Sequence, residues 1–450
     1  MTGVPERFPG ATIAAVAVIF LTTYAGSLIW FPKPNGRILI GDALHHYVQL
    51  RSSVFDRDLR FQNEYVRLYG LKGGEPDTEW IYDVTPTGYV RNKMPVGPAL
   101  LWSPLFLLVT LGVWLAGLMG STYPLDGYGR LFQASAGLTG IIAAGAGSWI
   151  AYRAARSLFG TRPAIWATLT IWLASSAVYY SVISPTYSHA PSMLAVGAFW
   201  LAWLRVLDRP TLRGYAVLGA LCGVAALMRW QDALLLLVPA LDVLWHLRAS
   251  GPRQAAARLA VCGAAAALAF SPQMVVWSRL YGAPLAIPQG DAFMRWHDPA
   301  LISMLFSDRH GLLSWTPVIA LSIAGFLPLV WRFPLVGTAA ILYFLASWYV
   351  NAAAADWWAG EAFGARRFVS CFPVFVLGLA ALLDRLKATT RTSAAMMVVF
   401  CSLTFLLLLQ YQTFMHGRPD LAPYPEGLHG LWLARFRVPF DLLGSWLGSR

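Results

Sequence analysis

Long apolar runs constrain this chain more than any other feature of its sequence. A transmembrane helix needs about 20 apolar residues, and the runs here are roughly 15–24 residues long. The strands of a membrane β-barrel would instead show alternating segments of about ten residues. Only 12% of the 450 residues are charged and 57% are hydrophobic, whereas a soluble surface needs about a quarter charged. We therefore expect an all-α polytopic integral membrane protein.

The runs predict twelve helical segments. They are 11–31, 97–117, 129–152, 163–183, 189–206, 214–228, 232–247, 256–277, 314–331, 334–350, 367–384 and 393–411. Segments 214–228 and 232–247 are too short to cross a bilayer fully at 1.5 Å per residue. The turn between them is therefore expected below the membrane surface, where Arg229 and Asp232 require a polar cavity.

Arginine positions predict the orientation of the helices. From 163 onward, arginines gather at alternate ends of the segments, and the positive-inside rule places them in the cytoplasm. Loop 32–95 and tail 412–450 are then extracytoplasmic parts of one integral domain, 1–450, whose transmembrane bundle spans 11–411. To keep this orientation, either 97–117 or 129–152 is expected to be re-entrant or interfacial. We therefore expect about eleven crossings of the bacterial inner membrane.

Several protein classes lose support because their motifs are absent. The sequence has no GxxxxGK[ST], no GxGxxG after a strand, no HExxH and no GxSxG. The four cysteines lie in apolar runs, which disfavours a disulfide framework or a CxxC metal site. The net charge of +12 is scattered over short loops and indicates topology, so we expect no nucleic-acid partner. No cofactor is expected and no metal is indicated.

A carboxylate follows the first span by about ten residues. Asp42 begins a stretch in which Leu44, Tyr47 and Val48 recur at near-helical spacing, which predicts an interfacial helix in the extracytoplasmic loop. A carboxylate at the lipid boundary can act as general base on a hydroxyl group. Spacing alone favours the alternative that Asp42 caps this helix, and the two roles are compatible. The supporting residues expected in this loop are His45, Asp56 and Asp58.

Cationic residues enter two later spans at headgroup depth. Arg309 and His310 precede one span, and Arg366 and Arg367 precede another. Arginine binds phosphate oxygens in a bidentate manner, so we expect these four residues to bind a donor phosphate, with Arg229 deeper in the cavity. The competing interpretation is that the arginines extend to bulk lipid phosphates.

Three more polar residues are expected to support the site. They are His189, Asp232 and Glu361. A histidine at a membrane interface is more often a structural residue, and Asp232 can simply neutralise Arg229.

The order of these motifs resembles the GT-C superfamily of polytopic glycosyltransferases, in particular bacterial protein O-mannosyltransferases and lipid A aminoarabinose transferases. The matching stretches, within about 11–385, are GD at 41–42, FDRDL at 55–59, NEY at 63–65, NKMPVGPALL at 92–101, SH at 188–189, RWQD at 229–232, RHGL at 309–312 and FGARRF at 363–368. The resemblance implies a GT-C fold, Asp42 as catalytic base, a polyprenyl-phosphate sugar donor and inversion at the anomeric carbon. Many relatives carry two adjacent acids, whereas Ala43 follows Asp42 here. A second carboxylate would have to come from Asp56, Asp58 or another loop.

The polar clusters and the resemblance together predict an inverting glycosyltransferase with an extracytoplasmic site. It would move a sugar from a polyprenyl-phosphate donor to a hydroxyl of an envelope glycan, lipid or protein acceptor, in contact with membrane lipids. Two alternatives remain open: a lipid-linked glycan flippase or transporter, and a non-catalytic lipid-binding subunit. The sequence leaves the sugar and the acceptor undefined.

Overall fold

The computed structural model describes residues 8–30, 38–70, 83–427 and 429–448. Within these ranges the chain is helical, with no strand and only two isolated β-bridges, Val84–Val90 and Met294–Ala354. Parts of the predicted extracytoplasmic loop, 32–37 and 71–82, lie outside the described residues. The all-α prediction is confirmed.

The described chain contains eight stretches long and apolar enough to cross a membrane. They are α1 (Phe8–Trp30), α4 (Gly97–Leu118), α5 (Arg130–Phe159), α8 (His189–Asp208), α12 (Pro252–Tyr281), α17 (Pro334–Ala353), η7 with α18 (Arg366–Cys371 and Phe372–Arg385) and α19 (Thr390–Met415). A ninth span results if α6 (Thr161–Leu173) is counted with the stretch Ser176–Ile183, although the two are bent by 69°. Each of the twelve predicted segments coincides with helix, but a count of eleven crossings is not confirmed.

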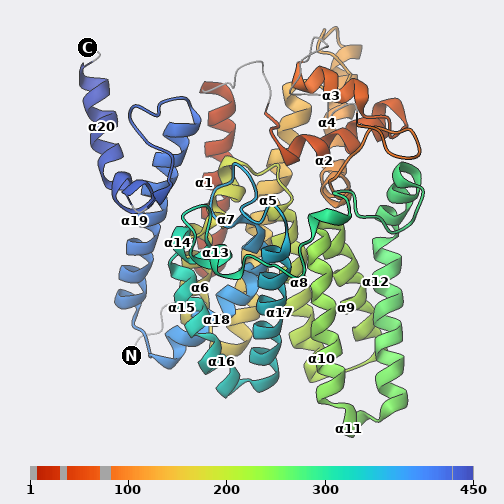
Figure 1. The fold of residues 1–450 in the computed structure, drawn as a ribbon, viewed down its shortest axis with the longest axis vertical. Coiled ribbons are helices and arrows are strands. Elements are labelled where there is room, and N and C mark those ends of the chain that lie inside the picture. Colours follow the sequence, from red (N-terminus) through yellow and green to blue (C-terminus); the bar gives the residue numbers. More distant parts are fainter. Residues whose placement is uncertain (1–7, 31–37, 71–82, 428, 449–450) are drawn as a thin grey trace.

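Shorter helices connect and cover this bundle. They are α2 (Asp42–Arg51), η2 (Ser52–Asp56), α3 (Gln62–Tyr69), α7 (Ser176–Val178), η4 (Tyr179–Ile183), α9 (Leu212–Met228), η5 (Trp230–Leu236), α10 (Leu237–Trp245), α11 (Leu247–Ser250), η6 (Asp291–Phe293), α13 (Leu301–Phe306), α14 (Leu312–Trp315), α15 (Val318–Ala324), α16 (Phe326–Arg332), η8 (His429–Leu433) and α20 (Ala434–Gly448). Figure 1 shows α9, α10 and α12 at one edge of the bundle and α19 and α20 at the other, with α2 and α3 near α4.

One of the segments 97–117 and 129–152 was expected to be re-entrant or interfacial. Both segments are continuous helices. α4 has 22 residues and α5 has 30, so each is long enough to cross a bilayer. α4 begins against the end of α9, where a Cβ on Gly97 would lie 2.2 Å from the carbonyl oxygen of Leu227. α5 begins beside the end of α1, where Arg130 donates to the carbonyl of Leu28. No re-entrant loop is seen in either segment, and an interfacial position for one of them stays a prediction.

The first helix of the loop is packed inside the protein. Ala43, Leu44, Tyr47 and Val48 of α2 are fully buried, and the Tyr47 hydroxyl donates to the carbonyl of Gly127 over 2.6 Å. α2 therefore lies against α4 and the segment before α5, and its position in the fold is fixed by a buried face.

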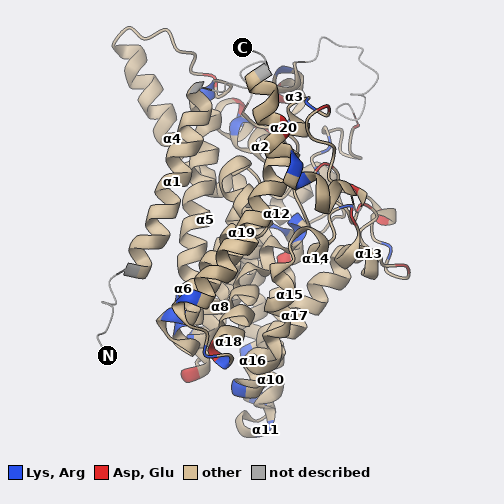
Figure 2. Cartoon of the chain, turned by 90° about the vertical axis from the view of Figure 1, so that its left-hand side faces the viewer, with Lys and Arg blue, Asp and Glu red and all other residues tan. Residues whose placement is uncertain are grey.

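Charged residues avoid the middle of the long helices. Figure 2 shows α1 and α4 free of charge along their described lengths, with a basic group where α6 begins. Placing charge at the ends of apolar helices is the arrangement that a bilayer imposes, because a charged side chain at mid-membrane is costly.

Candidate functional site

The site is organised by the predicted break between two short helices. α9 ends at Met228, Arg229 adopts an extended conformation (φ −152°, ψ 123°), and η5 begins at Trp230. The Arg229 backbone stays paired, because its N–H donates to the carbonyl of Ala225 and its carbonyl accepts from the N–H of Asp232. The Arg229 guanidinium is the centre of a polar network.

Arg229 contacts the start of α8 and the backbone of η7. Its Nη1 donates to Nδ1 of His189 over 2.9 Å and to the carbonyls of Arg366 and Arg367 over 3.5 and 3.4 Å. Its Nη2 donates to the side-chain oxygen of Gln231 over 3.1 Å. Because a guanidinium can only donate, Nδ1 of His189 must accept, so the ring is neutral with its proton on Nε2.

The predicted base and one predicted phosphate ligand meet in an ion pair. Nη1 of Arg366 lies 2.9 Å from a carboxylate oxygen of Asp42, and these side chains are 14% and 33% exposed. The Arg366 guanidinium also lies over the ring of Tyr187, 5.5 Å from its centroid. Residues 324 positions apart in the sequence therefore form one centre together with Arg229.

The environment of Asp42 favours its ionised form. Burial raises the pKa of this carboxyl, but the positive charge of Arg366, followed by smaller contributions from His46, His45 and Arg367, outweighs burial, so its pKa lies below the ordinary value. Asp42 is also the first residue of α2, where a negative charge is stabilised by the free N–H groups. A carboxylate that stays ionised is ready to accept a proton.

The alternative that Asp42 caps α2 is wrong. The N-cap is Gly41, with a positive φ of 54°, and no side chain caps this end of the helix. Glycine is required here for two reasons. Its φ is in the left-handed region, and a Cβ at this position would lie 2.7 Å from the Tyr187 hydroxyl oxygen. Gly41 thus lets the start of α2 approach the turn before α8, which aims Asp42 at Arg366.

Arg367 is already paired with a different carboxylate. Its Nη2 lies 2.5 Å from Oδ1 of Asp356, and its carbonyl accepts from the side-chain amide of Gln231 over 3.0 Å. Arg366 is paired with Asp42. Of the three arginines in the network, only Arg229 has no carboxylate within ion-pair distance in the part of the chain that the structure describes.

Asp232 does not neutralise Arg229 by direct contact. It is fully buried, and one carboxylate oxygen accepts from the hydroxyl of Ser192 over 2.5 Å, which lies 2.9 Å from the hydroxyl of Ser370. The other oxygen is buried without a hydrogen-bond partner. Asp232 therefore ties η5 to α8 and η7, and Arg229 contacts His189 instead of this carboxylate.

Arg309 and His310 form a second cluster beside the tail. His310 is buried, and its ring nitrogens contact the carbonyl of Trp358 at 2.7 Å and the hydroxyl of Tyr424 at 2.8 Å. The Arg309 side chain is 58% exposed and lies 3.7 Å from the carboxylate of Glu426. Burial lowers the pKa of His310 to about 4, so the imidazole is neutral near pH 7. The expected single cationic face is thus divided, and these two residues join other partners.

The remaining supporting residues have separate positions. His45 contacts the hydroxyls of Tyr65 and Tyr69 at 2.9 and 3.3 Å, one turn along α2 from Asp42. Glu361 is exposed.

Asp56 and Asp58 hold the far end of the first loop. Asp56 accepts from Asn63 over 2.8 Å and pairs with Arg51, while Asp58 accepts from Ser52 over 2.8 Å. At about 1.5 Å per residue, the helical stretch α2–η2 separates them from Asp42 by roughly 15–20 Å. The expectation that either one supplies a second carboxylate beside Asp42 is therefore wrong. Among the described residues, no group of three or more His, Cys, Asp or Glu side chains is placed to hold a metal ion.

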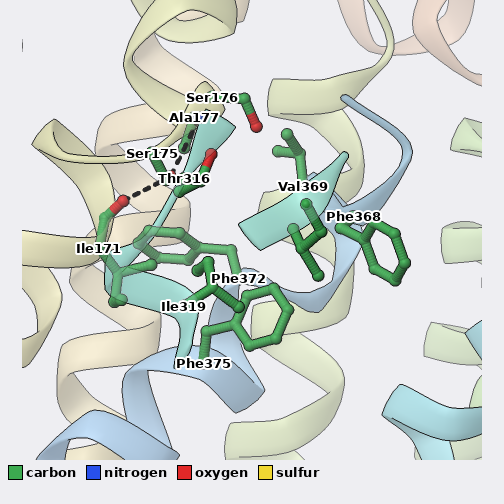
Figure 3. A pocket seen from close by; sticks show the side chains of 11 residues that line it. Ile171, Ser175, Ser176, Ala177, Thr316, Ile319, Phe368, Val369, Phe372 and Phe375 are labelled. Atoms are coloured by element: carbon green, nitrogen blue, oxygen red, sulfur yellow. Dashed lines mark hydrogen bonds between the residues drawn. The ribbon is translucent and has the colours of Figure 1, made fainter. Parts of the chain in front are cut away.

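A small cavity lies behind η7. Figure 3 shows its lining, which is mostly apolar and includes Phe368, Val369 and Phe372, with Ser175, Ser176 and Thr316 as the polar members. The space open to the centre of a water molecule is about 10 Å³, enough for roughly one water. No charged side chain lines this cavity, so it offers no phosphate site.

Three residues of the network were not predicted as site members. Gln231 lies inside a quoted motif and Tyr187 directly precedes another, but a glutamine and a tyrosine have many roles in such turns. Asp356 was visible as an acid ten residues before the arginine pair. The proximity of Asp356 to Arg367 could be expected from the charge pattern of the sequence alone. The close approach of Tyr187 to Gly41, in contrast, depends on the tertiary structure.

Comparison with known proteins supports the fold. No protein-family model matches the sequence, and no curated protein matches it. Among solved structures, the chain is similar to the archaeal oligosaccharyltransferase AglB from Archaeoglobus fulgidus in complex with an inhibitory peptide and a dolichol-phosphate, with a TM-score of 0.51 and 13% identity over 98% of this chain and 54% of AglB. ArnT from Cupriavidus metallidurans in the apo state matches with a TM-score of 0.48 and 14% identity over 97% of this chain and 76% of ArnT.

The similarity to AglB shows the fold. The chain shares the polytopic helical fold of this oligosaccharyltransferase, which agrees with the GT-C fold expected from the sequence. It spans about half the length of AglB. At 13% identity the likeness establishes the fold alone, so the roles of individual residues rest on the geometry of the site.

Proposed function

We propose that the protein is an inverting glycosyltransferase that moves a sugar from a polyprenyl-phosphate donor to a hydroxyl group of a cell-envelope acceptor. The observation that carries this proposal is the contact between Asp42 and Arg366 beside the unpaired Arg229. One ionised carboxylate and two cations in a partly exposed centre are what such a transfer requires. The GT-C fold supports the same conclusion, since AglB was solved with dolichol-phosphate.

Each group has a defined task in the proposed reaction. Asp42 accepts the proton of the acceptor hydroxyl while that oxygen attacks the anomeric carbon of the sugar. The bond between this carbon and the phosphate oxygen breaks, and polyprenyl phosphate leaves with the bonding electron pair. Arg229 and Arg366 stabilise the negative charge that develops on the phosphate. Attack from the face opposite the phosphate inverts the configuration.

The charge pairing suggests an exchange on donor binding. Arg367 is held by Asp356, whereas Arg229 has only neutral partners and is the cation most available to a phosphate. A phosphate bound to Arg229 attracts the Arg366 guanidinium as well, because Arg229 contacts the backbone carbonyl of Arg366. Asp42 then loses its ion pair with Arg366 as the acceptor arrives. Its pKa rises, so Asp42 is a stronger base at the step in which it accepts the proton.

An apolar groove supports a lipid-linked donor. A groove of about 380 Å³ is lined by Trp230, Gln231, Leu234, Leu237 and Val350. Gln231 also belongs to the Arg229 network, so the groove begins at the proposed phosphate site. A polyprenyl tail in this groove would leave its phosphate beside Arg229.

The Asp42→Asn variant tests the proposal. Asn keeps the size of the side chain but cannot accept the proton, so transfer should fall by about 10²–10⁴-fold. Purified protein is supplied with a panel of radiolabelled polyprenyl-phosphate sugars and a membrane extract as acceptor, and release of polyprenyl phosphate is followed by chromatography. The matched control is Asp83→Asn, which alters an exposed acid paired with Arg91 and should leave the rate unchanged. A well-folded Asp42→Asn protein with the wild-type rate would disprove the assigned base.

We further propose that the site faces the extracytoplasmic side of a bacterial inner membrane. Basic residues at the opposite helix ends support this orientation through the positive-inside rule. A cysteine at exposed Pro419 should react with an impermeant maleimide in intact spheroplasts, whereas a cysteine at Ser250 should react only after lysis. The reverse pattern would place the site in the cytoplasm.

A further inference from the structure

A second cationic hollow lies at the other end of the bundle, and the proposed transfer reaction does not use it. It is a groove of about 670 Å³ between α5, α8 and the junction of α16 and α17. Its lining includes Arg153 and Arg156 of α5 and Arg205 of α8. Arg205 follows His189 by 16 residues of one helix, which separates the groove from the site by about 24 Å.

The three arginines of this groove carry uncompensated charge. All three are exposed, and none forms an ion pair within the described ranges of the chain. The sole acid in the lining is Asp208, so the formal charge of the groove is +2. Three guanidinium groups near a single carboxylate still repel one another, and an anion with several oxygens relieves this repulsion by bridging them.

Apart from Ser157, the rest of the lining is apolar. Leu201, Leu204, Phe333 and Val336 form walls, and Trp149 lies beneath Arg153, whose guanidinium is 6.0 Å from the indole ring. A free anion in water gains nothing from such walls. A lipid with a negative headgroup contacts both the arginines and the apolar walls. Its phosphate binds the arginines, while its glycerol and upper acyl chains cover the apolar side chains.

We infer that this groove is a binding site for one anionic phospholipid, held by its headgroup phosphate at the end of the bundle remote from the transfer site. Basic pockets between transmembrane helices are suited to anionic headgroups, and Trp149 has the aromatic character expected at the membrane interface. The lipid would join α5 and α8 to the α16–α17 junction. The groove thus has a structural ligand that differs from the proposed donor in both place and chemistry.

Native mass spectrometry of the detergent-solubilised protein tests the inference. The protein is titrated with phosphatidylglycerol or with phosphatidylcholine of the same acyl chains. Wild type should retain one phosphatidylglycerol preferentially. The variant R153Q/R156Q/R205Q should lose this preference, with affinity falling by about fivefold for each arginine removed, or on the order of a hundredfold in total. The matched control R248Q/R253Q/R391Q removes three exposed arginines outside the groove and should keep the preference.

A further variant and a competing ligand distinguish the possible outcomes of this titration. Leu201→Trp keeps every charge but fills an apolar wall, so it should also weaken phosphatidylglycerol, and it serves if the triple variant fails to fold. Glycerol 3-phosphate should not displace the lipid, and equal competition by it would indicate a site for free phosphate esters. Retention of the preference by the triple variant, or an equal loss in the control, would overturn the inference. Asp42→Asn should leave the lipid in place, so this test fails or succeeds independently of the transfer reaction.

Discussion

The ion pair between Asp42 and Arg366 predicts how the proposed transfer reaction responds to pH. Their nearest atoms are 2.9 Å apart, which places the charge centres about 4 Å apart. At that separation two unit charges interact by about 1 kcal/mol in water and about 4 kcal/mol at an effective dielectric constant of 20. Because the Asp42 side chain is 33% exposed, we take about 2 kcal/mol for this pair.

Arg366→Gln removes this interaction and leaves the burial of Asp42. In the wild type the pKa of Asp42 is held below its ordinary value, so the base stays ionised into acidic solution. Without Arg366, burial raises the pKa, and protonation begins at a higher pH. The acidic limb of kcat/KM against pH, which reports the protein before the donor binds, should therefore move upward by about 1.5 pH units, since 1.36 kcal/mol corresponds to one pH unit.

The transfer assay, run between pH 4 and pH 8, measures this shift. Arg367→Gln is the matched control, because Arg367 is paired with Asp356 and contributes less to the pKa of Asp42 than Arg366 does. It should move the limb much less. If the limb of Arg366→Gln coincides with that of the wild type, or if both variants move it equally, Asp42 is not the titrating base that Arg366 controls.

Two further pairs of variants separate the site from its surroundings. Arg229→Gln should lower donor-dependent initial rates by roughly 30–150-fold, because a lost charged contact costs about 2–3 kcal/mol. Arg309 is exposed and lies outside the Arg229 network, so Arg309→Gln should change these initial rates by no more than about fivefold. A larger loss would indicate that Arg309 contacts the donor. Gly41→Ala should lower the melting temperature in scanning fluorimetry more than Gly70→Ala. Gly70 has a left-handed helical backbone (φ 69°, ψ 32°), and no described residue lies within 4 Å of a Cβ there, whereas a Cβ at Gly41 (φ 54°, ψ −135°) would be strained by its backbone and would meet the Tyr187 hydroxyl. Equal shifts would refute both causes.

The helices were predictable because apolar length is a local property of the sequence. All twelve segments coincide with helix, and even the break at Arg229 followed from two runs that are too short. The number of crossings was not predictable in this way. Whether a helix such as α4 crosses depends on where both its ends lie, and its start is fixed by a contact between Gly97 and the distant Leu227.

The site was predictable by residue type but only partly by contact. Asp42, Arg229 and Arg366 were expected together and lie together. Arg309 and His310 belong to the same type of motif, yet the fold gives His310 two neutral partners. A sequence shows which residues have charge, whereas the partner that neutralises each charge is decided by packing between distant segments.

The 324 positions between Asp42 and Arg366 have a consequence for how the protein is made. At about 5–20 residues per second, the carboxylate leaves the ribosome roughly 15–65 s before its arginine exists. Until residue 366 is made, the nascent chain has Asp42 and, once residue 229 is added, Arg229, but it lacks Arg366 and the η7 carbonyls that accept hydrogen bonds from Arg229. Under the proposed function, sugar transfer therefore begins only after the last third of the chain has packed against the first.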